Sequence, residues 1–290
     1  MTAEPVRVSS AWLQLREAAD ATARSSDLVE QIRPDLPAGG GAVIHDLGCG
    51  TGSMGRWLAP RLRGTQHWIL YDRDAGLLAH AGAATPGVAA DGAAVTIQTR
   101  LRDITALDPG DLAGASLITA SALLDMMTAD ELERLVTTCA AAGCPALITI
   151  SVIGRVDLTP ADPLDARITS AFNAHQRRRT GGRRLLGPDA VDAAVEAFTR
   201  LGADVLVRPS PWQLGPGQAP LASTWLTAWV SAACEQRPEL TSDAAAYVRR
   251  RLAQASAGRL SVWVHHHDLL ARPRRPLSAP MNPAHDLAPA

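Results

Sequence analysis

The sequence has few cysteines and no excess charge of either sign. Only four of its 290 residues are cysteine, and no two of them stand in C-x-x-C spacing. We therefore expect reduced thiols rather than a disulfide framework or a cysteine-based metal site. The 28 Lys and Arg residues balance 29 Asp and Glu residues, so no basic field attracts a nucleic acid partner.

Long hydrophobic runs are missing as well. The apolar stretches are too short to span a bilayer, and the first residues, MTAEPVRVSS, contain no apolar signal core. We expect a cytoplasmic protein without a membrane partner. Hydrophobic residues still make up 47% of the chain, which is enough for a sizeable core.

A glycine-rich turn follows the first apolar run of the chain. Residues 42–57 read AVIHDLGCGTGSMGRW. This pattern predicts a buried strand ending near Asp46, then a tight turn, then a helix. Glycines at positions 48, 50 and 52 let the backbone lie against a ligand where a side chain would collide. A dinucleotide-binding turn would have a third glycine where Ser53 stands, which argues against NAD.

The seven residues 46–52, Asp-Leu-Gly-Cys-Gly-Thr-Gly, resemble the first motif of class I S-adenosylmethionine-dependent methyltransferases. The resemblance covers residues 42–154 by motif and extends more weakly to residue 268. It implies S-adenosylmethionine as cofactor and S-adenosylhomocysteine as product. The residues that it places at the cofactor are Asp46, Gly48, Cys49, Gly50 and Gly52.

A second strand, His67–Tyr71, ends in an acidic residue. Asp72 lies 20 residues beyond Gly52, and a carboxylate at this strand end can accept hydrogen bonds from both ribose hydroxyls. Arg73 follows in the register of the family. We prefer Asp72 to Asp74 for the ribose, because Asp74 stands where the N-cap of the next helix is expected.

Further cofactor contacts are implied by the resemblance. Asp103, after a third strand at 94–99, would receive the adenine amino group, and Ile104 would lie against the ring. Ser121, after a fourth strand at 117–120, also belongs to the expected cofactor site. Arg16, on an N-terminal helix within residues 10–33, would face the cofactor carboxylate, together with Arg24. A solvated arginine on an amphipathic helix is the alternative.

Strands alternate with helices along most of the chain. Strands are expected at 147–153, 203–208 and 259–266, and helices at 129–139, 165–178, 188–202, 221–236 and 242–255. This order predicts an α/β, Rossmann-like, doubly wound sheet of seven mainly parallel strands. The resemblance adds that the last strand runs antiparallel beside the fifth and sixth.

We expect one methyltransferase domain at residues 10–272. A flexible N-terminus at 1–9 and a disordered tail at 273–290 would flank it. Segments 10–33, 155–187 and 210–256 would form a helical lid over a pocket suited to a small molecule.

Two ionisable residues are candidates for work on the acceptor. His175 lies in the first insertion and has a pKa suited to proton exchange near neutrality. Asp125 follows the fourth strand. A structural histidine is the alternative for His175. Tryptophans 212, 225 and 229 would form an apolar acceptor wall, or belong to the core.

Two other clusters do not predict sites. The run 265–267 is three consecutive histidines, but adjacent strand residues alternate faces and cannot converge on one ion, so we predict no metal. The arginine-rich segment 177–184 lacks interleaved aromatic residues and indicates a solvated loop.

The predicted function is methyl transfer to a small-molecule acceptor at oxygen, nitrogen or carbon. Three alternatives stay open: a non-catalytic S-adenosylmethionine-binding module, an aminopropyl transferase and an RNA methyltransferase. A homodimer also stays open.

Overall fold

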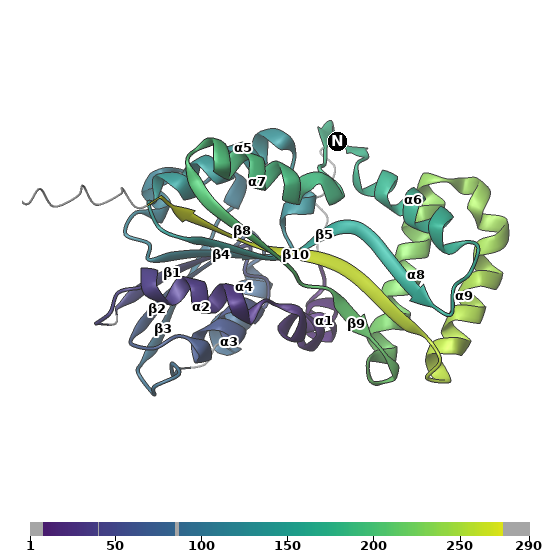
Figure 1. The fold of residues 1–290 in the computed structure, drawn as a ribbon, viewed down its shortest axis with the longest axis horizontal. Coiled ribbons are helices and arrows are strands. Elements are labelled where there is room, and N and C mark those ends of the chain that lie inside the picture. The colour runs from purple at the N-terminus through teal and green to yellow at the C-terminus, as the bar shows by residue number, and fades with distance from the viewer. Residues whose placement is uncertain (1–7, 40, 85–86, 275–290) are drawn as a thin grey trace, which may run out of the picture.

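A twisted sheet forms the middle layer of the molecule (Figure 1). The computed structural model describes residues 8–39, 41–84 and 87–274. Parallel strands run in the order β3-β2-β1-β4-β5, and β10 lies antiparallel between β5 and β8. The strands are β1 (Ala42–Leu47), β2 (Gln66–Asp72), β3 (Val95–Leu101), β4 (Leu117–Ser121), β5 (Ala146–Thr159), β8 (Ala203–Pro209) and β10 (Ser261–Pro273). The predicted fold class, an α/β Rossmann-like doubly wound sheet with its last strand antiparallel, is confirmed, and the described residues form eight strands of this sheet where seven were predicted.

Helices cover both faces of this sheet, as Figure 1 shows. One apolar cluster joins α5 (Ala129–Ala141) and α7 (Ala190–Arg200) to one face. A second cluster joins α2 (Ser26–Ile32), α3 (Ser53–Leu58) and α4 (Ala75–Ala84) to the other. Strands β1 and β4 are buried almost throughout because both faces are covered.

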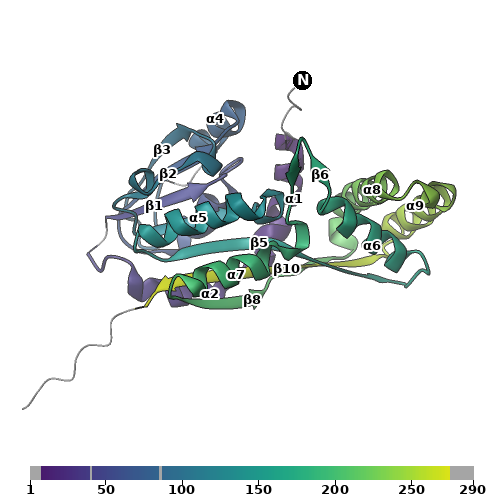
Figure 2. The ribbon, with the colours of Figure 1, turned by 90° about the horizontal axis from the view of Figure 1, so that it is seen from above.

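A helical unit stands beside the sheet, at one end of β5 and β10 (Figure 2). It contains α6 (Asp165–Gln176), α8 (Ala219–Gln236) and α9 (Thr241–Ser256), and it has its own apolar cluster. That cluster includes Leu158 of β5 and Val262 of β10, so both strands continue from the sheet into the unit. A short strand, β9 (Trp212–Leu214), pairs with the start of β10.

Smaller elements occupy the connections. β6 (Arg179–Thr180) and β7 (Arg183–Arg184) pair as a hairpin in the segment predicted to be a solvated loop. The 3₁₀ turns are η1 (Arg33–Asp35), η2 (Ala59–Arg61), η3 (Ile104–Ala106), η4 (Pro109–Leu112), η5 (Leu124–Met126), η6 (Gly187–Asp189), η7 (Pro216–Gln218) and η8 (Pro238–Leu240).

The sequence prediction differs from the structure at three elements. The helix expected within 10–33 is two helices, α1 (Ser10–Ala23) and α2, because the Ser25 side chain accepts from Leu28 N and begins a new helix. The fifth strand extends beyond its predicted end to Thr159, because Leu158 packs in the helical unit. The last strand extends beyond its predicted end to Pro273, because residues 267–273 pair with β8. The mobile ends were predicted at 1–9 and 273–290, and of these only residues 8, 9, 273 and 274 are described. Ser9 caps α1, and Pro273 belongs to β10. No helix in the described part of the chain is long and apolar enough to cross a membrane.

Candidate functional site

A cavity of about 620 Å³ lies where β1, β2 and β4 end, between the sheet and the helical unit. Its walls come from α1, the glycine turn, the ends of these strands and α6. Most of the predicted cofactor residues line it, namely Asp46, Gly48, Cys49, Gly50, Asp72, Arg73, Asp103, Ile104, Ser121 and Arg16. Gly52 belongs to the same turn without lining the cavity. Parallel α/β sheets bind ligands at this edge.

The glycine turn leaves no room for side chains. Gly48, Gly50 and Gly52 have φ angles of +66°, +54° and +84°. A Cβ atom on Gly50 would lie 3.0 Å from Leu13 Cδ1, and one on Gly52 would lie 3.1 Å from Ala81 Cβ. Both the backbone conformation and the packing therefore require glycine, and the bare backbone faces the cavity.

Asp72 is held rigidly beside this turn. Its Oδ2 accepts a hydrogen bond from Gly50 N and its Oδ1 accepts one from Asp74 N, each at 2.9 Å. Asp74 in turn accepts from Gly76 N and Leu77 N, which caps α4. The two acids thus have separate positions, and the fixed Asp72 carboxylate retains lone pairs for two ribose hydroxyls.

A buried acid, Asp46, lines the cavity, and a buried cation, Arg24, lies behind two serines of its wall. Thr119 Oγ1 donates to Asp46 Oδ1 at 2.8 Å, while Asp46 Oδ2 has no hydrogen-bond partner among the described residues. Burial raises the pKa of Asp46 to about 6. Arg24 Nη2 donates to Ser53 Oγ and Ser121 Oγ, both at 3.1 Å, and both serines line the cavity.

Arg24 itself is enclosed. It is 3% exposed, and its Nε and Nη1 have no partner in the described structure. Burial lowers its pKa. Arg24 does not line the cavity, so it would act on a ligand there through the Ser53 and Ser121 hydroxyls.

The opposite end of the cofactor half is more open. Asp103 is exposed, and its Oδ1 accepts from Thr105 N and Thr105 Oγ1. Ile104 is buried beside it. Arg73 lines the cavity and is exposed. Cys49 is buried, and burial raises the pKa of its thiol, so it remains a neutral wall residue.

Arg16 faces the cavity but is already bound. Its Nε and Nη2 donate to the Asp20 carboxylate at 2.9 and 3.1 Å. Its guanidinium lies 4.9 Å from the centroid of the Trp212 ring, and Trp212 Nε1 donates to Asp20 Oδ1. The predicted contacts of Arg16 and Arg24 with the cofactor carboxylate stay predictions, and of the two residues Arg16 lines the cavity.

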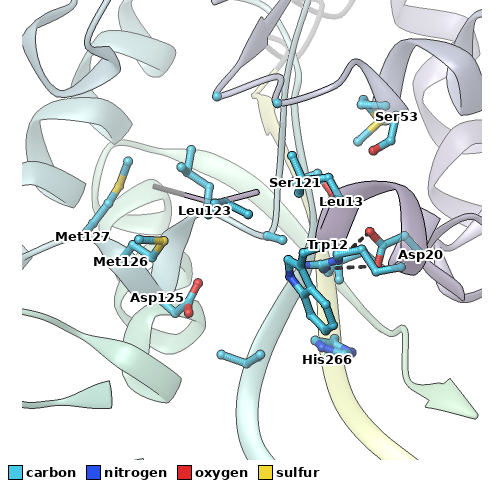
Figure 3. A pocket seen from close by; sticks show the side chains of 18 of the residues that line it. Trp12, Leu13, Asp20, Ser53, Ser121, Leu123, Asp125, Met126, Met127 and His266 are labelled. Atoms are coloured by element: carbon cyan, nitrogen blue, oxygen red, sulfur yellow. Dashed lines mark hydrogen bonds and ion pairs between the residues drawn. The ribbon is translucent and has the colours of Figure 1, made fainter. Parts of the chain in front are cut away.

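Asp125 lies in the other half of the cavity, on the turn after β4 (Figure 3). Burial raises its pKa to about 6. Gln176 Nε2, on α6, donates to its Oδ2 at 3.4 Å. A carboxyl group with this pKa exchanges a proton near neutrality, as a general base must.

His175 does not line the cavity. Its Nε2 lies 3.0 Å from Glu235 Oε2 on α8, and its Nδ1 contacts Arg178. At 100° per residue, Asn173 and Gln176 share one face of α6 and point to the cavity, whereas His175 points away from that face. The base role of His175 stays a prediction that this position does not support.

Several lining residues were not predicted. Trp12 and Leu13 come from α1, and Asn173 and Gln176 from α6. Helical spacing along 172–176 was the available signal, because it separates the face of Asn173 from that of His175. The histidine was chosen for its chemistry alone.

The tryptophans and histidines divide between the cavity and its surroundings. Trp212 and Trp225 line the cavity, whereas Trp229 is 1% exposed and stacks on Trp225. His266 is buried in the wall, and burial lowers its pKa to about 3, so it is neutral. His265 Nε2 contacts Asp157 Oδ2 at 2.7 Å. Among the described residues, no three His, Cys, Asp or Glu side chains are grouped to hold a metal ion.

No family model and no curated protein sequence matches this chain. Three solved structures illustrate what it is similar to. The cyclopropane synthase MmaA2 from Mycobacterium tuberculosis is 14% identical over 91% of this chain and 95% of that chain, with a TM-score of 0.48. The magnesium protoporphyrin IX methyltransferase ChlM from Synechocystis PCC 6803 is 14% identical over 72% and 83%, with a TM-score of 0.43.

The third is the geranyl diphosphate C-methyltransferase from Streptomyces coelicolor A3(2). It is 12% identical over 85% of this chain and 80% of that chain, with a TM-score of 0.44. Sheet order and strand directions, rather than these likenesses, establish the fold of the present chain.

Proposed function

We propose that this chain is a cytoplasmic S-adenosylmethionine-dependent methyltransferase that acts on a small-molecule acceptor. The observation that carries the proposal is one cavity with two chemically different halves. One half has the bare glycine turn, Asp72 and the unpartnered oxygen of Asp46. The other has Asp125 among apolar side chains.

The cofactor half has a group for each part of S-adenosylmethionine. Asp72 would hold the ribose, and the residues after β3, Asp103 and Ile104, would hold the adenine. Asp46 would hold the ammonium. Arg24, through Ser121 and Ser53, would hold the carboxylate. S-adenosylmethionine is a co-substrate here, and it supplies an electrophilic methyl group.

The acceptor half would align the second substrate. Methyl transfer gains most from holding the acceptor atom in line with the methyl group and from excluding water. Met126, Met127 and Trp12 line this half and make it apolar. Asp125 would orient the acceptor and take its proton. The lid predicted at 10–33, 155–187 and 210–256 supplies α1, α6 and α8 to the walls, and its closure remains a proposal.

The other functions differ in what the cavity would have to contain. An aminopropyl transferase needs several acids for a polyamine, and Asp125 is a single acid. An RNA methyltransferase needs an open basic face, whereas the helical unit encloses the acceptor half. A non-catalytic module would bind the cofactor with no use for Asp125.

Calorimetry with S-adenosylhomocysteine tests the cofactor half. We expect binding to the wild-type protein and at least a tenfold loss, about 1.4 kcal/mol, in Asp72→Ala. Asp192→Ala, which removes an exposed carboxylate on α7, is the matched control and should bind as the wild type does. Unchanged affinity in Asp72→Ala would remove Asp72 from the site.

Labelled methyl transfer in cell extract tests the reaction. Label in a small molecule supports the proposal, and label in RNA supports the RNA alternative. Cofactor binding without any transfer supports the module. Transfer only from the decarboxylated cofactor supports the aminopropyl transferase.

A further inference from the structure

The charges around the acceptor half cancel except at one residue. Three arginines line this half, and each is paired with its own acid at 2.9 Å or less. The pairs are Arg16 with Asp20, Arg155 with Asp157 and Arg183 with Glu131. Asp125 has no ion pair among the described residues, and its carboxylate accepts a hydrogen bond from the neutral amide of Gln176. An unpaired carboxylate in a partly enclosed site favours a cationic ligand.

Two amide side chains beside Asp125 each have an acceptor oxygen without a hydrogen-bond partner among the described residues. Gln176 donates its Nε2 to Asp125, which leaves Gln176 Oε1 without a partner in the described structure. Asn173 donates its Nδ2 to the Gly154 carbonyl at 2.7 Å, which leaves Asn173 Oδ1 without one.

The amide orientation of Asn173 is fixed, because a backbone carbonyl can only accept hydrogen bonds. The same reasoning fixes Gln176 against an ionised Asp125. Positions 173 and 176 lie one turn apart on α6, so their free oxygens belong to one face. Both oxygens are buried, so the acceptor open to a ligand in the cavity is the Asp125 carboxylate.

Aromatic rings surround this group. Phe172 from α6, Trp225 from α8 and Trp12 from α1 line the same half. Figure 3 shows Asp125 on one side of the cavity and Trp12 on the other. The faces of such rings attract cations, most strongly where water is excluded.

We propose that the methyl acceptor is an amine, bound as its ammonium between Asp125 and these aromatic side chains. The proposal rests on the methyltransferase function above and narrows it to N-methylation. An ammonium has donors only and so matches the Asp125 carboxylate, whereas a carboxylate or phosphate ligand has no donor. A hydroxyl offers a single donor and no charge.

In the reaction that follows from this proposal, Asp125 is the base that takes a proton from the ammonium. One N–H proton of the ammonium passes to the Asp125 carboxylate and frees the nitrogen lone pair. That pair forms the bond to the methyl carbon while the carbon–sulfur bond breaks, and its electrons remain on sulfur. The nitrogen is neutral after it loses the proton, and it becomes positively charged again when the nitrogen–carbon bond forms. Asp125 then returns its proton to water.

Three probes of similar size test the proposal without needing turnover. They are 2-phenylethylamine, 2-phenylethanol and 3-phenylpropanoate, titrated by calorimetry at pH 7.5 with and without S-adenosylhomocysteine. We expect the amine to bind about tenfold or more tightly than the alcohol, since a hydrogen-bonded charge adds to the aromatic contact. The carboxylate should not bind measurably.

Asp125→Asn should remove the preference for the amine, and Asp130→Asn, on the exposed start of α5, should keep it. Gln176→Met leaves Asp125 in place and should weaken amine binding severalfold. Equal or tighter binding of the alcohol or the carboxylate would overturn the proposal, and so would a preference that survives in Asp125→Asn. These outcomes do not depend on cofactor binding, whereas failure of the S-adenosylhomocysteine titration counts against the methyltransferase function alone.

Discussion

Two carboxyl groups in the cavity, Asp46 and Asp125, share a raised pKa of about 6. Burial is the main cause in both, because it penalises the charged form. A carboxyl group whose folded pKa lies above its unfolded value binds its proton more tightly in the folded protein. Its ionisation therefore costs stability above about pH 6, and the cost disappears below the unfolded pKa. Both residues therefore lower the stability of the folded protein near neutral pH, and we expect their function to lie in ligand binding.

Asp46→Asn should stabilise the protein and weaken its cofactor binding. The amide oxygen can still accept from Thr119, while the buried charge is removed. We expect a gain of about 2 kcal/mol at pH 8 and most of it lost at pH 4, from urea unfolding at both values. S-adenosylhomocysteine affinity should fall because the ammonium loses its carboxylate. A variant destabilised equally at both pH values would contradict this account.

Asp125 should set the acidic limb of the rate profile. The base must be ionised in the free enzyme, so kcat/KM should fall as pH decreases through about 6. Asp125→Asn should lose about 10²-fold or more of kcat and this limb of the profile, measured as initial rates with the identified acceptor. His175→Ala is the comparison: because His175 lies outside the cavity, it should keep both the limb and most of kcat. The reverse pattern would return the base role to His175.

At the scale of elements, one side chain of β10 joins β5 to the start of α2. Asp268 is fully buried, and its Oδ1 accepts from Ile150 N while its Oδ2 accepts from Ser25 N, both at 2.8 Å. Ile150 lines the cavity with a φ of +57°, a conformation that β-branched residues rarely adopt. The hydrogen bond from Asp268 therefore holds a strained wall residue in place.

Asp268→Ala should destabilise the protein by about 2–4 kcal/mol, because two buried N–H groups lose their acceptors. Urea unfolding at pH 8 measures this loss. Asp204→Ala, which breaks a pair between exposed Asp204 and Arg272 on the neighbouring strand, should change stability by less than about 0.5 kcal/mol. Similar small losses in both variants would show that Asp268 does not hold Ile150.

Over the whole molecule, local patterns predicted the sheet and the cofactor half better than the acceptor half. The glycine turn is encoded by seven consecutive residues, 46–52, and Asp72 directly follows a short apolar strand. Both could therefore be located from neighbouring residues in the sequence. The predicted cofactor contacts themselves remain to be tested.

The acceptor half depends on packing between distant segments. The side of α6 that faces the cavity is set by its contact with α8, about 60 residues later, and this is why Asn173 was missed and His175 was chosen. The break before Ser25 was hidden for the same reason, since an apolar pattern continues through it. The outer half of β5 becomes a strand only against β10 and the helical unit, and the missed end of β10 becomes a strand against β8.

Strands β5 and β10 run without interruption from the main sheet into the helical unit. This determines where the helical unit could be exchanged between proteins of this fold. The helical unit has no linker at which it can be cut, because both strands run through it. Their pairing is irregular between Val152, opposite His266, and Val156, opposite Val264. A graft joined there would exchange α6, α8 and α9 together with α7 and β8. The recipient would keep its own glycine turn, Asp72 and Asp125, so such a graft would separate the contribution of the helical unit to acceptor preference from that of Asp125.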